Sequence, residues 1–157
     1  MANQYAWMSN NSIFLTKTLS ANTMKKFSIS FVLGFLSLAV IGSVFANYIY
    51  LPTFAEWHQL YPEVIRASLD PLSGLLQAII QLLGLVVLVD RLKITKLVNG
   101  LIFGAIYSAG IWLIVDLNMV SLTTIVDYNY VLLDALISAV IGGVGGMVVA
   151  WSQHKFA

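Results

Sequence analysis

Long apolar segments alternate with short polar ones along this chain. Four segments are mostly apolar over about 20 residues, the length that a helix rising about 1.5 Å per residue needs to cross a bilayer. They cover residues 27–50, 71–89, 98–117 and 130–151. Their apolar runs lack the strict alternation of apolar and polar residues that membrane β-strands show. The pattern predicts an all-α integral membrane protein in which four helices form one bundle.

The segment that joins the first two spans, residues 51–71, is amphipathic. Its apolar and aromatic residues recur at helical spacing, at Phe54, Trp57, Leu60, Tyr61, Val64 and Ile65. This spacing predicts a short helix at the outer membrane interface, broken or bent near Pro62. Pro71 suits the first turn of the second span, with Asp70 as its N-cap.

Residues 1–23 are polar and rich in Asn and Ser, which predicts a flexible tail ahead of a single transmembrane domain at 24–157. Met24 begins a stretch with the form of a bacterial start, in which two lysines precede an apolar run. Ala46 is placed as a signal peptidase would require, so cleavage of the first span is an alternative. We favour a retained membrane anchor, because the apolar run is longer than a usual signal core.

Composition and charge set the expected location. Hydrophobic residues make up 59% of the chain and charged residues 10%, whereas a soluble domain carries about a quarter charged residues. Cytoplasmic segments retain Lys and Arg, and the cations at one set of span ends are Lys17, Lys25, Lys26, Arg91, Lys93, Lys96 and Lys155. The prediction is a bacterial inner-membrane protein with both termini in the cytoplasm. Aromatic residues expected to anchor the span ends are Tyr48, Tyr50, Tyr128, Tyr130 and Trp151.

Several classes of protein are excluded by what the chain contains. Lys and Arg are scattered, so we expect no nucleic-acid partner. The chain has no cysteine, which removes disulfides and thiol chemistry. His58 and His154 fall on opposite sides of the predicted membrane, so we expect no heme, metal or other cofactor. Glu56, His58 and Glu63 match no metal-ligand spacing, and no arrangement of Ser, His and Asp predicts a hydrolase.

Small residues mark the expected faces for helix packing, namely Gly74, Gly84, Gly100, Gly104, Gly142, Gly143, Gly145 and Gly146. In lipid, such residues let helix backbones approach closely. The run "GGVGG" lacks the Lys and the Ser or Thr of a phosphate loop, which favours packing over nucleotide binding. At about 100° per residue, Gly142 and Gly145 share one face of the fourth helix and Gly143 points the other way. One of these faces is a candidate contact for a second copy or a partner membrane protein.

Polar groups within the spans gather in their predicted outer half. The candidate ligand- or proton-binding residues are Gln77, Gln81, Tyr107, Asp116, Asp134 and Ser138. A carboxylate at mid-membrane costs about 2.5 to 3.5 kcal/mol on insertion scales, and less near a helix end. Two interpretations of Asp134 follow. It either caps or tethers the fourth helix through Tyr, Ser or backbone groups, or it binds a proton or cation in an outward cavity.

The layout resembles the small uncharacterised four-helix membrane protein families of bacteria, known only as domains of unknown function. The likeness lies in an aromatic-rich exit from the first span ("ANYIYLPTFAEW"), a Gly-rich third span ("NGLIFGAIYSAGIWLIVDLN") and an acid that opens a small-residue fourth span ("VLLDALISAV"). Residues 1–23 have no counterpart in that pattern. The resemblance implies a four-helix inner-membrane bundle and carries no activity or site residues with it.

Three functions stay open at this stage. The leading hypothesis is a non-enzymatic membrane protein in contact with membrane lipid, acting as a bundle that binds a lipid or small ligand, or as an accessory or assembly subunit or homo-oligomer. The rival is a small dimeric transporter or proton-coupled permease that uses Asp134, with Gln77 and Gln81 along its path. The third is a membrane enzyme acting on lipids, which requires Asp116 and Asp134 to lie close together.

Overall fold

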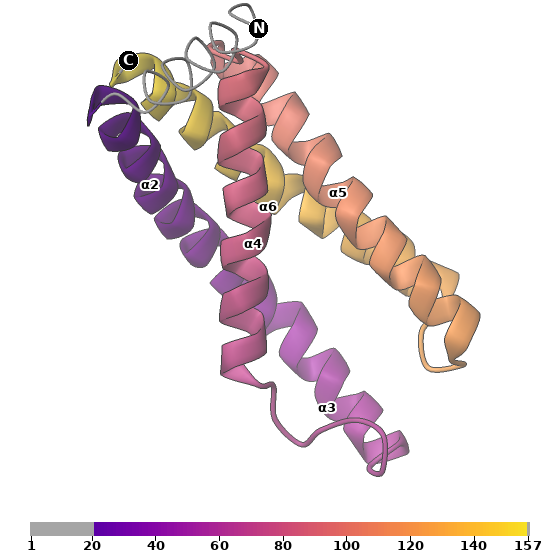
Figure 1. Cartoon of the computed structure of the whole chain (residues 1–157). Coiled ribbons are helices and arrows are strands. Elements are labelled where there is room, and N and C mark those ends of the chain that lie inside the picture. The colour runs from indigo at the N-terminus through magenta and orange to yellow at the C-terminus, as the bar shows by residue number, and fades with distance from the viewer. Residues whose placement is uncertain (1–20, 157) are drawn as a thin grey trace, which may run out of the picture.

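The structure is a computed structural model that describes residues 21–156, and every regular element in this range is helical. The elements are α2 (Ala21–Phe45), the short π-helix η1 (Ala46–Tyr50), α3 (Leu51–Leu60), α4 (Pro71–Arg91), α5 (Leu97–Leu122) and α6 (Tyr128–Lys155) (Figure 1). Four stretches of helix are long and apolar enough to cross a membrane, and the first of them joins α2, η1 and α3. The all-helical prediction is therefore confirmed. The tail predicted at 1–23 lies outside the described residues, apart from 21–23 in the first turn of α2.

The first helix does not end at the proline that follows the first predicted span. Proline has no N–H to donate, and its ring collides with the carbonyl four residues before it. Here a π-helical turn precedes Pro52, and the Leu51 N–H donates to Ala46 O, five residues earlier. The helix then continues to Leu60. The short helix predicted within 51–71 is therefore α3, and it is a direct extension of α2 rather than a separate element (Figure 1).

Side-chain caps fix where α4 and α6 begin. Asp70 accepts hydrogen bonds from the N–H groups of Leu72 and Ser73, and Pro71 occupies the first turn of α4, as the sequence predicted. Asp127 caps α6 in the same way. These caps satisfy N–H groups that the first turn of a helix leaves without partners.

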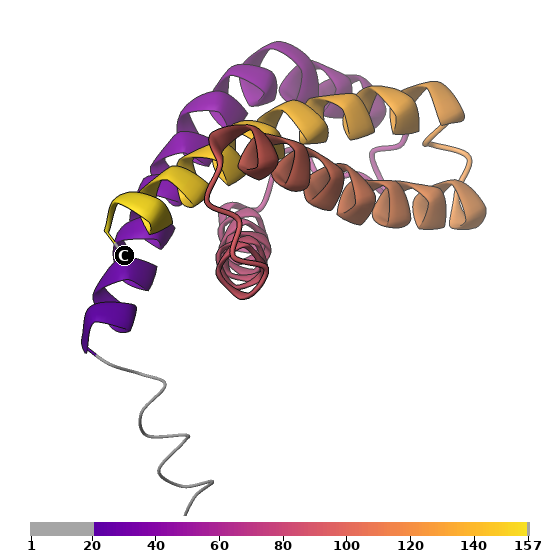
Figure 2. The same cartoon turned by 90° about the horizontal axis from the view of Figure 1, so that it is seen from above.

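Helix α6 occupies the middle of the molecule. It runs beside α5 in the opposite direction, and α2 packs on its other side (Figures 1 and 2). Figure 2 shows α4 nearly end-on, to one side of the other helices. The start of α2, the α4–α5 connection and the C-terminus lie at one end of the molecule, which we call the terminal end (Figure 1). The α3–α4 and α5–α6 connections lie toward the other end, the loop end.

Four glycines let α5 and α6 approach until their backbones touch. A Cβ atom at Gly100 would fall 2.6 Å from Gly146 O, and one at Gly104 would fall 2.9 Å from Gly146 Cα. Gly142 and Gly146 meet the facing backbone of α5 in the same way. No side chain fits at these positions unless one helix moves. The close approach increases van der Waals contact, which matters most for helices in lipid because apolar burial does not draw them together there.

The other glycines of α6 complete two contact faces. At Gly143 an added Cβ would lie 3.3 Å from Leu101 O of α5, whereas at Gly145 it would meet Leu38 of α2. This grouping differs from the predicted one, which placed Gly142 with Gly145 and Gly143 opposite. The reason is the breadth of the α5 contact. Helices that touch backbone to backbone cover an arc of about 100°, wide enough to include positions 142, 143 and 146 together.

Three further glycines have different surroundings. Gly84 leaves room for the Tyr107 hydroxyl, as a packing position should. Gly74 has no atom within 4 Å of its Cβ position, so it packs against no other helix among the described residues. Gly34 was not singled out from the sequence, yet it is buried against Leu82 and Val149.

Helix α4 is anchored by its second half, at the terminal end. Lys26 of α2 and Asp90 of α4 form an ion pair at 2.6 Å, and the Gln153 amide of α6 donates to Val86 O at 3.0 Å. The buried core beside these contacts consists of Leu82, Leu85, Val86, Val89, Val149 and Ala150. The first turns of α4, at 71–77, are exposed instead. The helix is thus held firmly at one end and stands away from its neighbours at the other.

Replacing Gly104 by Ala should destabilise the protein, because the new methyl group would collide with the backbone of α6. Overpacking of this kind costs about 1–3 kcal/mol. Gly110→Ala is the matched control on the same helix, since nothing lies within 4 Å of its Cβ position. It should stabilise by up to about 1 kcal/mol, because alanine is the better helix former. Thermal unfolding in detergent, followed by circular dichroism, measures both variants, and equal stability would contradict the close contact.

Candidate functional site

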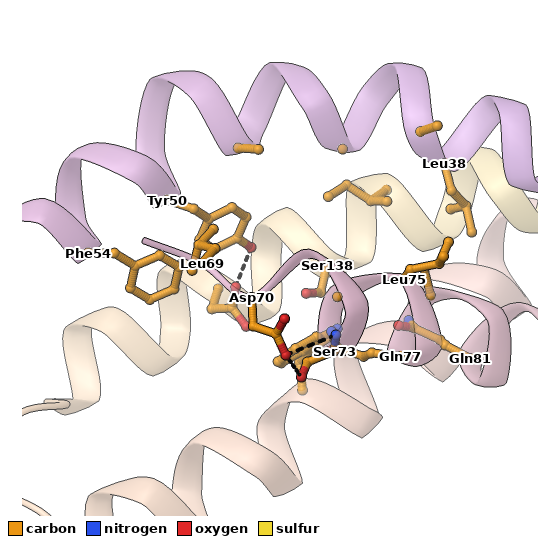
Figure 3. Close-up of a pocket in the computed structure, with 18 of the residues that line it drawn as sticks. Leu38, Tyr50, Phe54, Leu69, Asp70, Ser73, Leu75, Gln77, Gln81 and Ser138 are labelled. Carbon is orange, nitrogen blue, oxygen red and sulfur yellow. Dashed lines mark hydrogen bonds between the residues drawn. The ribbon is translucent and has the colours of Figure 1, made fainter. Parts of the chain in front are cut away.

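A cavity of about 600 Å³ lies between α2 and η1 on one side and α4 on the other, with α6 along its wall (Figure 3). Most of the lining is apolar, and its polar members are Tyr50, Asp70, Ser73, Gln77, Gln81, Tyr130, Asp134 and Ser138. The lining residues Ser73, Gly74 and Gln77 are exposed, so the cavity is open along the first turns of α4. Its volume falls within the range of small-molecule sites, about 300–1,000 Å³.

Asp134 lies in the cavity wall and is almost completely buried, with 3% of its surface exposed. The Tyr50 hydroxyl donates a hydrogen bond to Asp134 Oδ1, which Figure 3 marks with a dashed line. Ser138, one turn further along α6, lies close to the same hydroxyl. Tyr50 is the last residue of the π-helical turn. The irregular turn before Pro52 therefore ends at the residue that joins the first helix to α6.

Asp116 meets Asp134 across the contact between α5 and α6. The two carboxyl groups lie within hydrogen-bonding reach of each other, and Asp116 is 6% exposed. Asp116 Oδ2 and Asp134 Oδ2 are buried and have no hydrogen-bond partner among the described residues. Tyr130 lies near both acids. The sequence did not show whether these two carboxyl groups meet, and the structure brings them together as an acid pair.

Two buried carboxyl groups that face each other are favoured when a proton lies between them. An ionised carboxylate only accepts hydrogen bonds, so two ionised groups would face each other without a donor. Like charges a few ångströms apart inside a protein also repel each other strongly, which is why paired aspartates elsewhere share one proton. A single proton supplies the missing donor and removes one of the charges. The acid pair is therefore a site that can take up and release a proton.

A second polar cluster joins α4 to α5. Gln81 Nε2 donates to Ser108 Oγ at 3.1 Å, and the Tyr107 hydroxyl donates to Gln81 O at 3.1 Å. Of the six residues predicted to bind a ligand or proton, those that line the cavity are Gln77, Gln81, Asp134 and Ser138. Asp116 contacts Asp134 without lining the cavity, and Tyr107 holds two helices together.

Asp70 borders the cavity at its open edge (Figure 3). The Ser73 hydroxyl donates to its carboxylate, as do the N–H groups of Leu72 and Ser73 at 3.3 Å. These hydrogen bonds, chiefly that from the Ser73 side chain, hold the pKa of Asp70 below its ordinary value. Because the folded-state pKa is the lower one, the stability that this ionisation adds is present above the unfolded pKa and is lost as pH falls through the folded pKa. At neutral pH, Asp70 is a fixed negative charge.

Aromatic rings continue from the cavity along α3. Tyr50 stacks on Phe54 with ring centres 6.2 Å apart, and Phe54 meets the edge of Trp57 at 5.4 Å. Trp57 then contacts Tyr130 of α6 at 4.8 Å. Tyr50 and Tyr130 were predicted to anchor a membrane interface. Here they line the cavity and flank the acid pair.

The connection after α3 folds back onto that helix. His58 Nδ1 lies 2.7 Å from Ile65 O. Within residues 21–156, no group of three or more His, Asp or Glu side chains lies close enough to hold a metal ion. His58 therefore has a structural contact in this connection.

Comparison of the chain with protein-family models, with curated proteins and with solved structures found no match. The cavity and the acid pair are consequently the features from which a function is inferred.

Sequence reasoning missed polar residues whose roles depend on which faces meet. Ser152 Oγ donates to Ser30 Oγ at 2.8 Å, and both serines are fully buried. Gln153 looks like a residue at the polar end of a span, yet 6% of it is exposed and it bonds to α4. For Tyr50 a signal was present, because Pro52 two residues later marks an irregular turn. For the serines and Gln153 no local signal distinguishes them from residues at a membrane interface.

Replacing Tyr50 by Phe should destabilise the protein by about 1–3 kcal/mol, because it removes the donor to a buried carboxyl group. Tyr48→Phe is the matched control in the same turn, since Tyr48 is 80% exposed and should tolerate the change. Thermal unfolding midpoints measure both. In a double-mutant cycle, the effect of Tyr50→Phe should shrink when Asp134 is already Asn. An effect of Tyr50→Phe no larger than that of Tyr48→Phe would show that this hydrogen bond contributes nothing.

Proposed function

We propose that this chain is an integral protein of the bacterial inner membrane, a four-helix bundle that binds a lipid-like or other small apolar ligand between α2, α4 and α6. The observation that supports the proposal is the cavity of about 600 Å³ with an apolar wall, a polar group at Asp134 and an open edge along α4. Such a space suits a molecule with one polar end. Its apolar part would pack on side chains such as Leu38 and Leu75, with its polar end near Asp134.

The proposed orientation follows from charge. Six of the cations lie at the terminal end, namely Lys25, Lys26, Arg91, Lys93, Lys96 and Lys155. Among the described residues, Arg66 is the one Lys or Arg near the loop end. Because cytoplasmic segments retain cations, the terminal end and both chain termini would face the cytoplasm. The cavity would then lie in the outer half of the bundle and open toward the outer leaflet.

The contacts that the glycines of α6 make favour ligand binding over assembly. An accessory or assembly subunit would present a small-residue face to its partner. Gly142 and Gly143 mark the two predicted faces, one of which was a candidate contact for a second copy. Both contact α5 of the same chain, and Gly145 contacts α2. These faces are occupied within one chain. The cavity, in contrast, has no occupant from the described part of the chain.

The acid pair also meets the distance requirement for an enzyme acting on lipids. Acid–base catalysis would need both carboxyl groups within reach of a substrate. Asp116 does not line the cavity, so the pair presents Asp134 alone to a bound molecule. We therefore place binding ahead of catalysis.

Replacing Gly42 by Phe should abolish ligand retention. Gly42 lines the cavity and has nothing within 4 Å of its Cβ position, so a side chain can start there without a backbone clash and its ring would occupy the cavity. Gly110→Phe is the matched control, because Gly110 has the same free space but does not line the cavity. The proteins would be extracted into nanodiscs, and every retained lipid, small molecule and protein identified by mass spectrometry.

We expect a retained molecule with the wild type and Gly110→Phe, and its loss with Gly42→Phe. Equal retention by both variants would count against the cavity as its site. A stoichiometric membrane protein in place of a small ligand would favour the assembly role instead.

A second candidate function, proton-coupled transport, is favoured by the acid pair. A transporter needs a group that exchanges protons beside the path of its substrate. Asp134 lines the cavity, and its carboxyl group lies beside that of Asp116. A single bundle of this size would need a second copy to enclose a pathway, in keeping with the dimeric transporter considered from the sequence.

The shared proton can be tested directly by infrared spectroscopy. Difference spectra between acidic and alkaline buffer should contain the C=O band of a buried protonated carboxyl group. Asp116→Asn and Asp134→Asn should each remove or shift this band, because each breaks the acid pair. Asp127→Asn is the control, since Asp127 is an exposed cap that Asn can replace. A band unchanged in both acid-pair variants would remove the support for proton coupling.

A further inference from the structure

The charged groups of the cavity wall have one sign. Asp70 and Asp134 contribute carboxyl groups, and no Lys, Arg or His is found among the residues described as lining it. Hydrogen bonds keep Asp70 ionised. Asp116 adds a further carboxyl group beside Asp134. The wall therefore stays negative, which attracts a cation and repels an anionic headgroup.

Asp134 also has an unused hydrogen-bond acceptor. Its Oδ1 accepts from Tyr50, whereas its Oδ2 is buried without a donor among the described residues. Asp116 Oδ2 is likewise buried without a donor among the described residues. A buried carboxylate oxygen without a partner is costly, so either the shared proton or a cationic ligand completes this site.

Aromatic rings line the same cavity as the acid. Phe35, Tyr50, Phe54, Trp112 and Tyr130 all line the same cavity. The face of an aromatic ring attracts cations, and aromatic cages bind quaternary ammonium groups for this reason. A carboxylate, several rings and an apolar space together match an organic cation better than a neutral lipid.

We propose that the cavity binds an apolar organic cation, whose positive group lies against Asp134 and whose apolar part fills the space between α2 and α4. This inference rests on the proposed function and adds the chemical class of the ligand. A positive charge beside Asp134 favours the ionised form of the acid pair. Binding of one cation therefore releases the shared proton to the solvent.

Proton release makes the affinity depend on pH. The titratable groups around Asp134 are Tyr50 of η1, Asp116 of α5 and Tyr130 of α6, with Asp70 on the same cavity wall. Phenols are neutral and Asp70 is ionised near neutral pH. The acid pair is thus the group that changes charge. Affinity for a permanent cation should rise with pH, as the competing proton is lost.

Two ions of the same shape and opposite charge test the inference without any variant. Tetraphenylphosphonium and tetraphenylborate would be equilibrated with the protein in nanodiscs of phosphatidylcholine, and binding to empty nanodiscs subtracted. We expect the phosphonium to bind at least about tenfold more tightly than the borate, a difference of about 1.4 kcal/mol. Equal binding, or tighter borate binding, would overturn the cation inference while the ligand cavity stands. If neither ion binds and no retained molecule appears in the mass spectra, both the ligand-binding function and the cation inference would be overturned.

Variants then locate the charge that matters. Asp134→Asn should weaken phosphonium binding at least about tenfold, whereas Asp127→Asn should leave it unchanged. Asp116→Asn should keep the binding but change its pH dependence, because the carboxyl group that shares a proton with Asp134 is gone. Wild-type affinity in Asp134→Asn would overturn the inference. If that variant does not fold, Gly42→Phe takes its place, and wild-type phosphonium binding by it would overturn the inference equally.

Discussion

The backbone contact between α5 and α6 is the constraint on which the rest of the structure depends. Each helix carries a stripe of residues at intervals of four, Gly100, Gly104, Ser108, Trp112 and Asp116 on α5, and Asp134, Ser138, Gly142, Gly146 and Ala150 on α6. Because the helices run in opposite directions, the end of one stripe faces the start of the other. The glycines at the terminal end bring the backbones together. The same closeness carries the carboxyl group of Asp116 to that of Asp134 near the loop end.

The position of α4 separates a packed half of the molecule from an open half. In its second half, Leu82, Leu85, Val86 and Val89 are buried. Polar contacts from Lys26 and Gln153 hold the same half. Its first turns contain Ser73, Gly74 and Gln77, which are exposed. With few large apolar side chains directed inward there, α4 does not close against α2. The cavity thus lies beside the part of α4 that precedes its first buried residue, Leu82.

Much of this arrangement could be predicted from the sequence, because it depends on local pattern. The length of the apolar segments predicted the four helices. Asp70 and Pro71 predicted the start of α4, since a cap acts within one turn. Gln77, Gln81, Asp134 and Ser138 were selected as polar groups within the spans, and they line the cavity. The four-residue spacing of small residues on two helices was also visible in advance.

The remaining features depend on pairing between segments that are distant in sequence. Pro52 predicts a break in the helix. The π-helical turn before it explains why the helix continues and why Tyr50 is placed beside α6. The grouping of the α6 glycines depends on how closely α5 approaches, which a helical wheel does not contain. Ser30 and Ser152 are 122 residues apart, and their hydrogen bond exists because α2 lies on α6. In each case, tertiary contact decides between two locally acceptable roles.

The acid pair also bears on the two interpretations of Asp134. A tether between helices needs a donor and an acceptor, and the bond from Tyr50 shows that Asp134 does serve as one. A tether alone gives no reason for a second buried acid, however. Asn at position 116 would donate to Asp134 directly and would need no proton, whereas Asp116 leaves an oxygen without a partner. Two carboxyl groups instead of one carboxyl and one amide make the contact depend on a proton. That dependence, beside a cavity with negative walls, favours the functional interpretation of Asp134 over the purely structural one.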